Sequence, residues 1–284
     1  MNISYVDMWP GFDIQSNWFN LLFKDILEKK DLNFISDPNK ADLIVCSTFG
    51  NEKSKYNALK IFYTGENYSP NLTDCDYSLS FDFDSYNNRN FRLPHWYLYI
   101  NWWGEPNFIH AEISMEMLKY RWSAEEIWNR ENFCSIVIGN PVQNRLEVAY
   151  KLNEYRQVHG YGTVFNQPFS GSKIDLLKYF RFNICFENTV SDGYVTEKLL
   201  QAKVAGCVPI YYGDYSVYKD FNAMGFINYN SIGDSETLKK YIQNMDKNKN
   251  FFSTFAAQPL FKVMPNLDRL YSFLIKIFKD RGIL

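Results

Sequence analysis

Residues 182–213 read FNICFENTVSDGYVTEKLLQAKVAGCVPIYYG, and this stretch decides the fold. An apolar run of strand length, residues 182–186, is followed by turn residues and then by a helix-like segment, residues 194–205. Gly206 stands where a helix C-terminal glycine is expected, and a second apolar run, residues 207–212, follows at once. Strand, loop, helix and strand in this order predict a right-handed crossover between two parallel strands.

The start of the predicted helix is a candidate anion site. The loop that leaves the first strand and the first turn of the helix meet at the carboxyl edge of the sheet, where free N–H groups favour a phosphate. Tyr194, Glu197 and Gln201 share one helical face, and Lys198 in the first turn opposes the helix dipole. An anionic ligand shared by Lys198 and the N–H groups would remove that conflict. The alternative is that Glu197 and Lys198 form an ordinary solvated pair.

The run FENTVSDGYVTEKLLQA, followed by GCVPIYYGD, resembles the signature of the α1,3/4-fucosyltransferases. The resemblance extends over residues 60–230 and is densest at residues 182–213. It implies an α/β protein of the GT-B type, in which a cleft separates two Rossmann-like domains. The N-terminal domain would bind the acceptor and the C-terminal domain would bind GDP-fucose. Tyr212 departs from the family pattern, because many members have tryptophan there.

Composition agrees with a globular protein that does not bind nucleic acid. Apolar residues make up 46% of the 284 residues, and the formal net charge is −2. The five cysteines are odd in number and form no CxxC pair, which favours a reducing compartment. The N-terminus lacks the features of a signal peptide, and no apolar run reaches the ~18 residues of a spanning helix. We therefore expect a cytoplasmic protein.

Strand-like and helix-like segments alternate along the chain, which predicts parallel sheets covered by helices on both faces. The strand-like segments are residues 2–8, 32–36, 43–47, 60–64, 133–138, 158–164, 182–186, 207–212 and 226–228. The helix-like segments are residues 16–30 with Ser16 as the cap, 115–130, 140–155, 173–181, 194–205, 236–245 and 267–279. We predict an acceptor domain at residues 1–130, a nucleotide domain at residues 131–262, and a C-terminal amphipathic helix at residues 263–284.

Glu66 follows the predicted strand at residues 60–64, at the sheet edge where ligands bind in open α/β folds. The segment FYTGEN, residues 62–67, is similar to the bacterial fucosyltransferase segment that holds the proposed catalytic base. The resemblance implies that Glu66 takes the proton from the acceptor hydroxyl. The alternative is a turn carboxylate without a role, in which case Glu105 and Glu112 are the rival carboxylates of this domain.

The donor-binding residues are also implied by resemblance. Arg145 lies in IGNPVQNRLEVAYKL, which is similar to the family segment with a phosphate-binding arginine. Arg145 and Lys198 would meet the charge of the diphosphate, and Asn188 would hold the diphosphate or the fucose. Tyr194 and Glu197 would hold the nucleoside, with Glu197 on the ribose. The alternative for Arg145 is an exposed helical arginine without a ligand.

Two further sequence features bear on the site: a pair of DxD motifs and an aromatic segment. The sequence DxD occurs at residues 74–76 and 82–84. In other glycosyltransferases a DxD motif holds a divalent metal, but neither copy lies near the Lys198 helix in the sequence. Because Arg145 and Lys198 can neutralise the diphosphate, we expect no metal. Residues 94–105, PHWYLYINWWGE, contain four aromatic residues of interest: Trp96, Tyr97, Trp102 and Trp103. They form either a platform for an acceptor sugar or part of the hydrophobic core, and core packing is favoured. His95 and His110 are interpreted as structural or surface residues.

The resulting prediction is an inverting transferase that moves L-fucose from GDP-β-L-fucose to O3 of N-acetylglucosamine or glucose in an oligosaccharide or glycoconjugate. The alternatives are a transferase for another nucleotide sugar, and a non-catalytic carbohydrate-binding protein. The C-terminal helix has Leu270, Phe273, Leu274, Ile277 and Phe278 on one face. That face either packs on the protein, which is favoured, or contacts the inner surface of the membrane.

Overall fold

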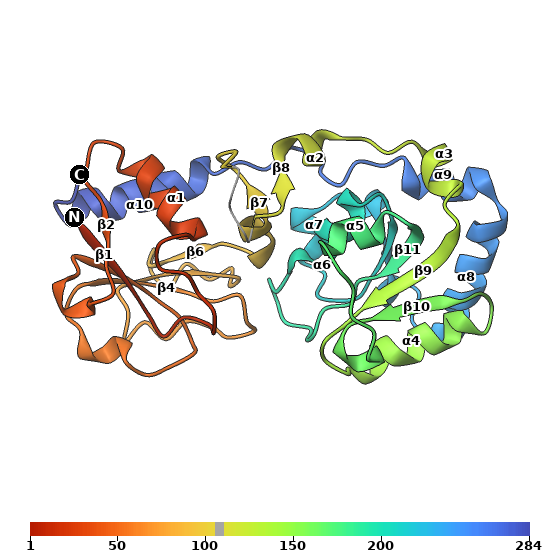
Figure 1. Ribbon diagram of the computed structural model, residues 1–284, viewed down its shortest axis with the longest axis horizontal. Coiled ribbons are helices and arrows are strands. Elements are labelled where there is room, and N and C mark those ends of the chain that lie inside the picture. The colour runs from red at the N-terminus through yellow and green to blue at the C-terminus, as the bar shows by residue number, and fades with distance from the viewer. Residues whose placement is uncertain (106–110) are drawn as a thin grey trace. The chain divides into compact units, whose positions relative to one another are not determined.

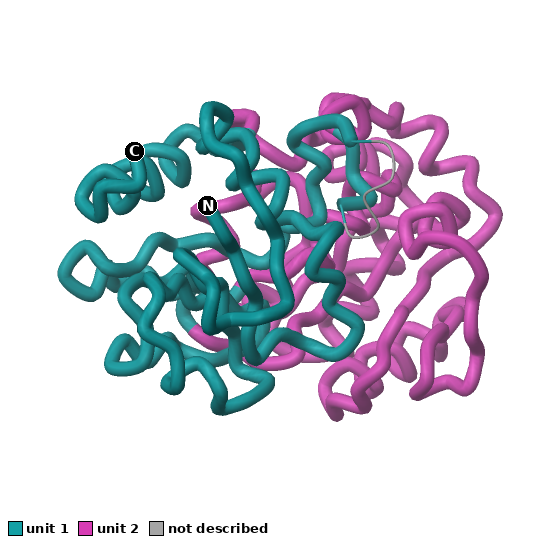
Figure 2. The backbone as a smooth tube through the Cα atoms, turned by 60° about the vertical axis from the view of Figure 1, so that its left-hand side comes forward, with its two compact units in different colours: residues 1–114, 192–194, 265–284 teal, residues 115–191, 195–264 magenta. Residues whose placement is uncertain are grey.

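The computed structural model describes residues 1–105 and 111–284, and the chain contacts divide it into two compact units (Figures 1 and 2). Unit 1 comprises Met1–Ser114, Asp192–Tyr194 and Pro265–Leu284; unit 2 comprises Met115–Ser191 and Val195–Met264. The first boundary thus lies at residue 114 and not at the predicted residue 130. The C-terminal segment, predicted as a separate element, belongs to unit 1. No helix in the described ranges is both long and apolar enough to cross a membrane.

The described part of unit 1 contains a six-stranded parallel sheet in the order β2-β1-β3-β4-β5-β6. Its strands are β1 Asn2–Val6, β2 Asn33–Phe34, β3 Leu43–Cys46, β4 Leu59–Tyr63, β5 Tyr77–Ser80 and β6 Asn90–Arg92. The central strands are buried on both faces, which explains why β3 reads as a continuous apolar run. The strand order reverses between β1 and β3, because β2 lies on one side of β1 and the later strands lie on the other. A ligand site is therefore expected at the carboxyl ends of β1 and β3.

Two helices cover one face of this sheet: α1 Trp18–Ile26 and α10 Asp268–Asp280 (Figure 1). The cap of α1 is Asn17, which accepts from the backbone of Asn20, and not the predicted Ser16. Phe23 of α1 and Phe278 of α10 meet with ring centroids 6.1 Å apart. The apolar face of α10 is therefore packed into the core of unit 1, the favoured of the two interpretations.

The opposite face of this sheet departs from the prediction. Residues Val6, Ile44, Cys46, Phe62 and Cys75 form a small core there, under loops and short 3₁₀ turns. The connections at residues 47–58 and 64–76 are rich in Gly, Asn and Ser, which favour turns over helix. The prediction of helices on both faces of the sheet is thus wrong for unit 1.

Most rings of the aromatic segment of unit 1 pack into or against the core. It forms a 3₁₀ helix, η3 His95–Tyr99, and a short strand, β7 Ile100–Asn101, which pairs with β8 Ile113–Ser114. Trp96 is buried, and Tyr97, Trp102 and Trp103 pack against the core under α1 and α10. The favoured interpretation of these four rings therefore agrees with the structure. His110 lies outside the described residues.

Unit 2 contains a second parallel sheet, in the order β10-β9-β11-β12-β13 among its described strands. They are β9 Asn132–Val137, β10 Val158–Tyr161, β11 Phe180–Ile184, β12 Val208–Tyr211 and β13 Ile227–Asn228. One face carries α4 Gln143–Asn153, α8 Ser235–Lys247 and α9 Lys249–Ala256. Right-handed crossovers place α5 Lys173–Leu177 and α6 Glu197–Val204 on the other face (Figure 1). The predicted α/β class with parallel Rossmann-like sheets is confirmed.

Three helix boundaries in unit 2 differ from the prediction. Residues 115–130 form two short helices, α2 Met115–Lys119 and α3 Ala124–Trp128, because Ser123 and Glu126 make a capping box that starts a new helix. The helix predicted at residues 173–181 ends at Leu177, since β11 already begins at Phe180. Helix α6 begins at Glu197 with Thr196 as the cap, so Tyr194 precedes the helix.

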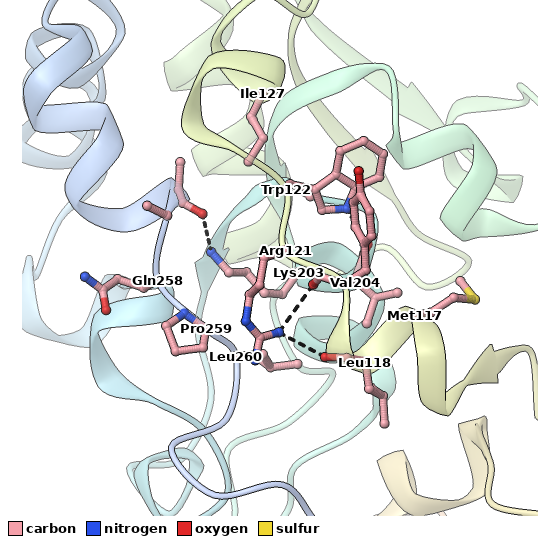
Figure 3. Close-up of a pocket in the computed structure, with 14 residues that line it drawn as sticks. Met117, Leu118, Arg121, Trp122, Ile127, Lys203, Val204, Gln258, Pro259 and Leu260 are labelled. Atoms are coloured by element: carbon pink, nitrogen blue, oxygen red, sulfur yellow. Dashed lines mark hydrogen bonds between the residues drawn. The ribbon is translucent and has the colours of Figure 1, made fainter.

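Lys203, near the end of α6, is buried, and among the described residues its ammonium contacts carbonyl oxygens and no carboxylate. Its Nζ donates to the carbonyl oxygens of Phe255 and Ala256 at 2.9 and 3.2 Å, at the last turn of α9. Figure 3 shows this lysine among the residues that line a small pocket, with Arg121 beside it. Burial, with a smaller contribution from the charge of Arg121, lowers the pKa of Lys203 to about 7.

This pKa predicts how stability depends on pH. The unfolded chain keeps Lys203 protonated up to about pH 10.4. Between pH 7 and that value the unfolded state therefore binds more protons, so stability rises with pH; below pH 7 the cost of the buried charge is fully present. From pH 7 to 9 we expect a gain of about 2 kcal/mol in the free energy of unfolding from this group. Urea unfolding of wild type and Lys203→Met should show that the variant loses this gain.

The matched control is Lys240→Met, which removes a lysine that is exposed on α8. It should keep the wild-type pH dependence. An unchanged gain in Lys203→Met would show that another group is responsible.

Candidate functional site

Polar side chains converge at the carboxyl ends of β9 and β11, where the strand order of unit 2 reverses. Arg145 on α4 donates from Nη2 to the carbonyl of Phe186 and to Oδ1 of Asn188, both at 2.5 Å. The arginine is only 2% exposed, so its guanidinium is held in one position beside the loop after β11. The structure therefore brings together two predicted site residues, Arg145 and Asn188. The alternative of an exposed helical arginine is wrong.

Glu187, which the sequence analysis did not assign, is the centre of a second set of contacts. Its carboxylate is 1% exposed and accepts from the Thr196 N–H at 2.7 Å and the Thr196 hydroxyl at 2.6 Å. It also accepts from Lys198 Nζ at 3.0 Å and from the Tyr211 hydroxyl at 3.4 Å. The carboxylate thus joins the end of β11 to the start of α6 and to β12.

Glu187 therefore changes the interpretation of Lys198 as a lysine that needs an anionic ligand. We expected an external anion to resolve the conflict between this lysine and the helix dipole, but Glu187 supplies a negative charge inside the protein. The signal in the sequence was an acid directly after a buried strand. It was missed because Glu187 and Lys198 are eleven residues apart and meet only through the fold.

Tyr211 and Gly213 complete the surroundings of this carboxylate. Burial and the charge of Glu187 raise the pKa of Tyr211 well above its usual value, so the phenol stays protonated and remains a donor. Gly213 allows the close approach, because a Cβ there would lie 2.4 Å from the Tyr211 hydroxyl and 2.9 Å from Cγ of Glu187. Any other residue at position 213 would push these groups apart.

The remaining predicted donor residues divide between the two units. Glu197 lies beside Lys198, with 3.8 Å between Oε1 and Nζ. Tyr194 is buried, and its ring meets Phe81 at 5.4 Å between centroids, within unit 1. The prediction that Tyr194, Glu197 and Gln201 share a helix face is wrong, because Tyr194 precedes α6.

Glu66 lines a pocket of about 370 Å³ in unit 1. It follows β4, and the pocket is therefore at the carboxyl edge of the first sheet. Trp9, Phe49 and Tyr99 contribute aromatic rings, and Gly65, His95 and Leu98 complete the lining. The sequence analysis missed Trp9 and Phe49, although each follows a buried strand, β1 or β3. Glu105 and Glu112 are not among the described residues that line this pocket.

The four DxD carboxylates have partners in unit 1. Asp76 accepts from the Lys60 backbone at 2.8 Å and pairs with Arg281 at 3.0 Å. Asp82 accepts from the hydroxyl of Tyr86 at 2.6 Å. Asp84 accepts from the Tyr86 backbone, and Asp74 from the hydroxyl of Thr73. In residues 1–105 and 111–284, no three His, Cys, Asp or Glu side chains are grouped as a metal site would require.

Two family models match successive parts of the chain. The alpha-(1,3)-fucosyltransferase FucT N-terminal domain matches residues 3–99, and the C-terminal part of glycosyltransferase family 10 (fucosyltransferase) matches residues 129–263. The chain is 29% identical over 281 residues to an alpha-(1,3)-fucosyltransferase FucT of Helicobacter pylori. That alignment covers 89% of this chain but 58% of the relative, so the chain spans less than two thirds of that protein.

The structure is also similar to solved structures. An alpha1,3-fucosyltransferase crystallised with GDP-fucose has a TM-score of 0.75 and 26% identity, over 98% of this chain and 90% of that one. The same type of enzyme crystallised with GDP has a TM-score of 0.74 at the same identity and coverage. The predicted GT-B fold class is thereby confirmed.

The contacts of Glu187 predict a large loss of stability when its charge is removed. Glu187→Gln leaves the Lys198 ammonium without its buried partner and turns an amide N–H₂ toward other donors, so the free energy of unfolding should fall by about 3 kcal/mol or more. The control is Glu154→Gln, an exposed carboxylate that also contacts two lysines and should cost less than about 1 kcal/mol. Equal losses in urea unfolding would contradict this account of Glu187.

Proposed function

Because the chain belongs to the fucosyltransferases of glycosyltransferase family 10, we propose that it transfers L-fucose from GDP-β-L-fucose to a glycan hydroxyl with inversion at the anomeric carbon. The product is an α1,3-fucoside, with O3 of N-acetylglucosamine or glucose as the acceptor atom. The observation that carries the proposal is the buried Arg145–Asn188 contact at the strand-order reversal of the family 10 domain.

The charged residues of unit 2 account for donor binding. The leaving GDP gains negative charge as the bond to fucose breaks, and fixed cations and N–H groups stabilise that charge. Arg145 and Lys198 provide the positive charge, and Lys198 is also paired with Glu187 inside the protein. Asn188 holds the diphosphate or the fucose. Tyr194 and Glu197 hold the nucleoside, with Glu197 on the ribose.

Unit 1 accounts for the acceptor. Glu66 takes the proton from the attacking hydroxyl, while the rings of Trp9, Phe49 and Tyr99 offer apolar faces to a sugar ring. The pocket joins a carboxylate to aromatic surface, the combination that a pyranose requires. The acceptor is an oligosaccharide or glycoconjugate.

A transfer assay with labelled GDP-fucose and a panel of acceptor glycans tests the function. We expect fucose on acceptors that carry N-acetylglucosamine or glucose, competition by GDP, and weak competition by GDP-mannose and UDP-sugars. Since Arg145 and Lys198 meet the diphosphate charge, activity should survive an excess of chelator. Transfer of another sugar would favour a different nucleotide-sugar transferase, and glycan binding without transfer would favour a non-catalytic protein.

We expect GDP affinity to depend on the guanidinium geometry of Arg145 and not on its charge alone. Arg145→Lys keeps the charge but loses the fixed guanidinium geometry, so GDP binding should weaken by roughly 1.5–3 kcal/mol, as for a lost charge-assisted hydrogen bond. Calorimetry on folded protein measures this. Arg156→Lys, at a partly exposed arginine of the same unit, is the control and should bind GDP as wild type does. Unchanged affinity in Arg145→Lys would remove its phosphate role.

Glu66→Gln keeps the shape of the side chain and removes the proton acceptor. A general base contributes ~10²–10⁴-fold, so kcat should fall by about that factor while GDP affinity stays near the wild-type value. Glu105→Gln and Glu112→Gln are the matched controls in the same unit and should keep most of the activity. Normal turnover by Glu66→Gln together with loss in one control would move the base to that residue.

A further inference from the structure

The position of Glu66 is set by its backbone. The Glu66 carboxylate makes no hydrogen bond to any other residue in the described ranges, and the side chain is exposed. Its backbone N–H donates to Oγ1 of Thr64 at 3.1 Å, and its carbonyl accepts from the N–H of Tyr68 at 2.7 Å. The conformation of the turn at residues 64–66 therefore decides where the carboxylate lies.

The imidazole of His95 lies directly against this turn. A Cβ added at Gly65 would lie 2.3 Å from Nδ1 of His95 and 2.5 Å from Cε1, so the ring occupies the space beside the Gly65 Cα. Gly65, Glu66 and His95 line the same pocket. A side chain other than hydrogen at position 65 would displace either the ring or the turn.

His95 is itself held by the residue before the turn. The hydroxyl of Tyr63 lies 2.8 Å from Nδ1 of His95, and Tyr63, the last residue of β4, is fully buried. The ring also meets Tyr99 at 5.3 Å between centroids, within the same 3₁₀ helix. Tyr63, at the end of β4, thus holds the His95 ring, and the ring in turn packs against the turn at Gly65.

We propose that His95, anchored by Tyr63, is a positioning residue that fixes the backbone at Gly65 and thereby places the Glu66 carboxylate. The proposal rests on the proposed function, since it concerns the base of that reaction. A general base acts only within hydrogen-bond reach of the proton that it removes, so a small shift of the turn slows proton transfer. It replaces the earlier interpretation of His95 as a merely structural or surface residue.

The inference predicts effects on kcat that depend on Glu66. His95→Ala should lower kcat roughly 10- to 100-fold, the range that a displacement of about 1 Å produces, with little change in GDP affinity. His95→Asn can place an oxygen near the position of Nδ1 and should recover most of this loss. Tyr63→Phe removes the anchoring hydroxyl and should lower kcat in the same direction as His95→Ala.

A double-mutant cycle gives the sharpest test. Gly65→Ala should slow the enzyme strongly when His95 is present, because the new methyl group meets the imidazole, and should have little effect in His95→Ala. In the Glu66→Gln background, where the base is already absent, His95→Ala should cause no further loss of kcat. Steady-state kinetics with calorimetry for GDP measures every variant.

Three results would overturn the inference: additive effects of Gly65→Ala and His95→Ala, an equal loss from His95→Ala with and without the Glu66 carboxylate, or a rise in acceptor KM alone. The last would make His95 an acceptor-binding residue. A wild-type chain that transfers no fucose would remove the proposed function and this inference with it. An active wild type with an additive cycle would remove the inference alone.

Discussion

The buried carboxylate of Glu187 is the interaction on which the site in unit 2 depends. A buried charge is costly unless donors surround it, and Glu187 receives hydrogen bonds from Thr196, Lys198 and Tyr211. These three donors come from the start of α6 and from β12, so one carboxylate fixes both ends of the crossover. Because such networks are costly when only partly satisfied, the start of α6 has little freedom to move.

The same carboxylate also pairs with one of the two cations proposed for the donor site. Lys198 Nζ lies 3.0 Å from Oε2 of Glu187, and Arg145 donates to the oxygens of Phe186 and Asn188. Both cations are thus tied to the loop after β11, at the strand-order reversal where α/β sheets bind ligands.

Most of the fold could be predicted because its signals are local. Buried parallel strands such as β3 are continuous apolar runs, and the crossover after β11 lies within one short stretch. The starts of helices were harder to predict. Ser16 and Asn17 are both good N-cap residues, and Tyr194 fits the helical spacing although it precedes the actual cap, Thr196. Side-chain roles that depend on distant partners had no local signal. Glu187 meets β12, and His95 meets a glycine thirty residues earlier in the chain.

The two candidate sites hold their side chains by different physical means. Unit 2 holds its guanidinium by burial and hydrogen bonds, so a small change in one group disturbs the others. The pocket of unit 1 has aromatic rings, which can make only nondirectional dispersion contacts, and a carboxylate that is placed only by its backbone. None of the described residues that line the unit 1 pocket belongs to the Glu187 or Arg145 contacts. Substitution of Trp9, Phe49 or Tyr99 should therefore alter acceptor choice while donor affinity is kept.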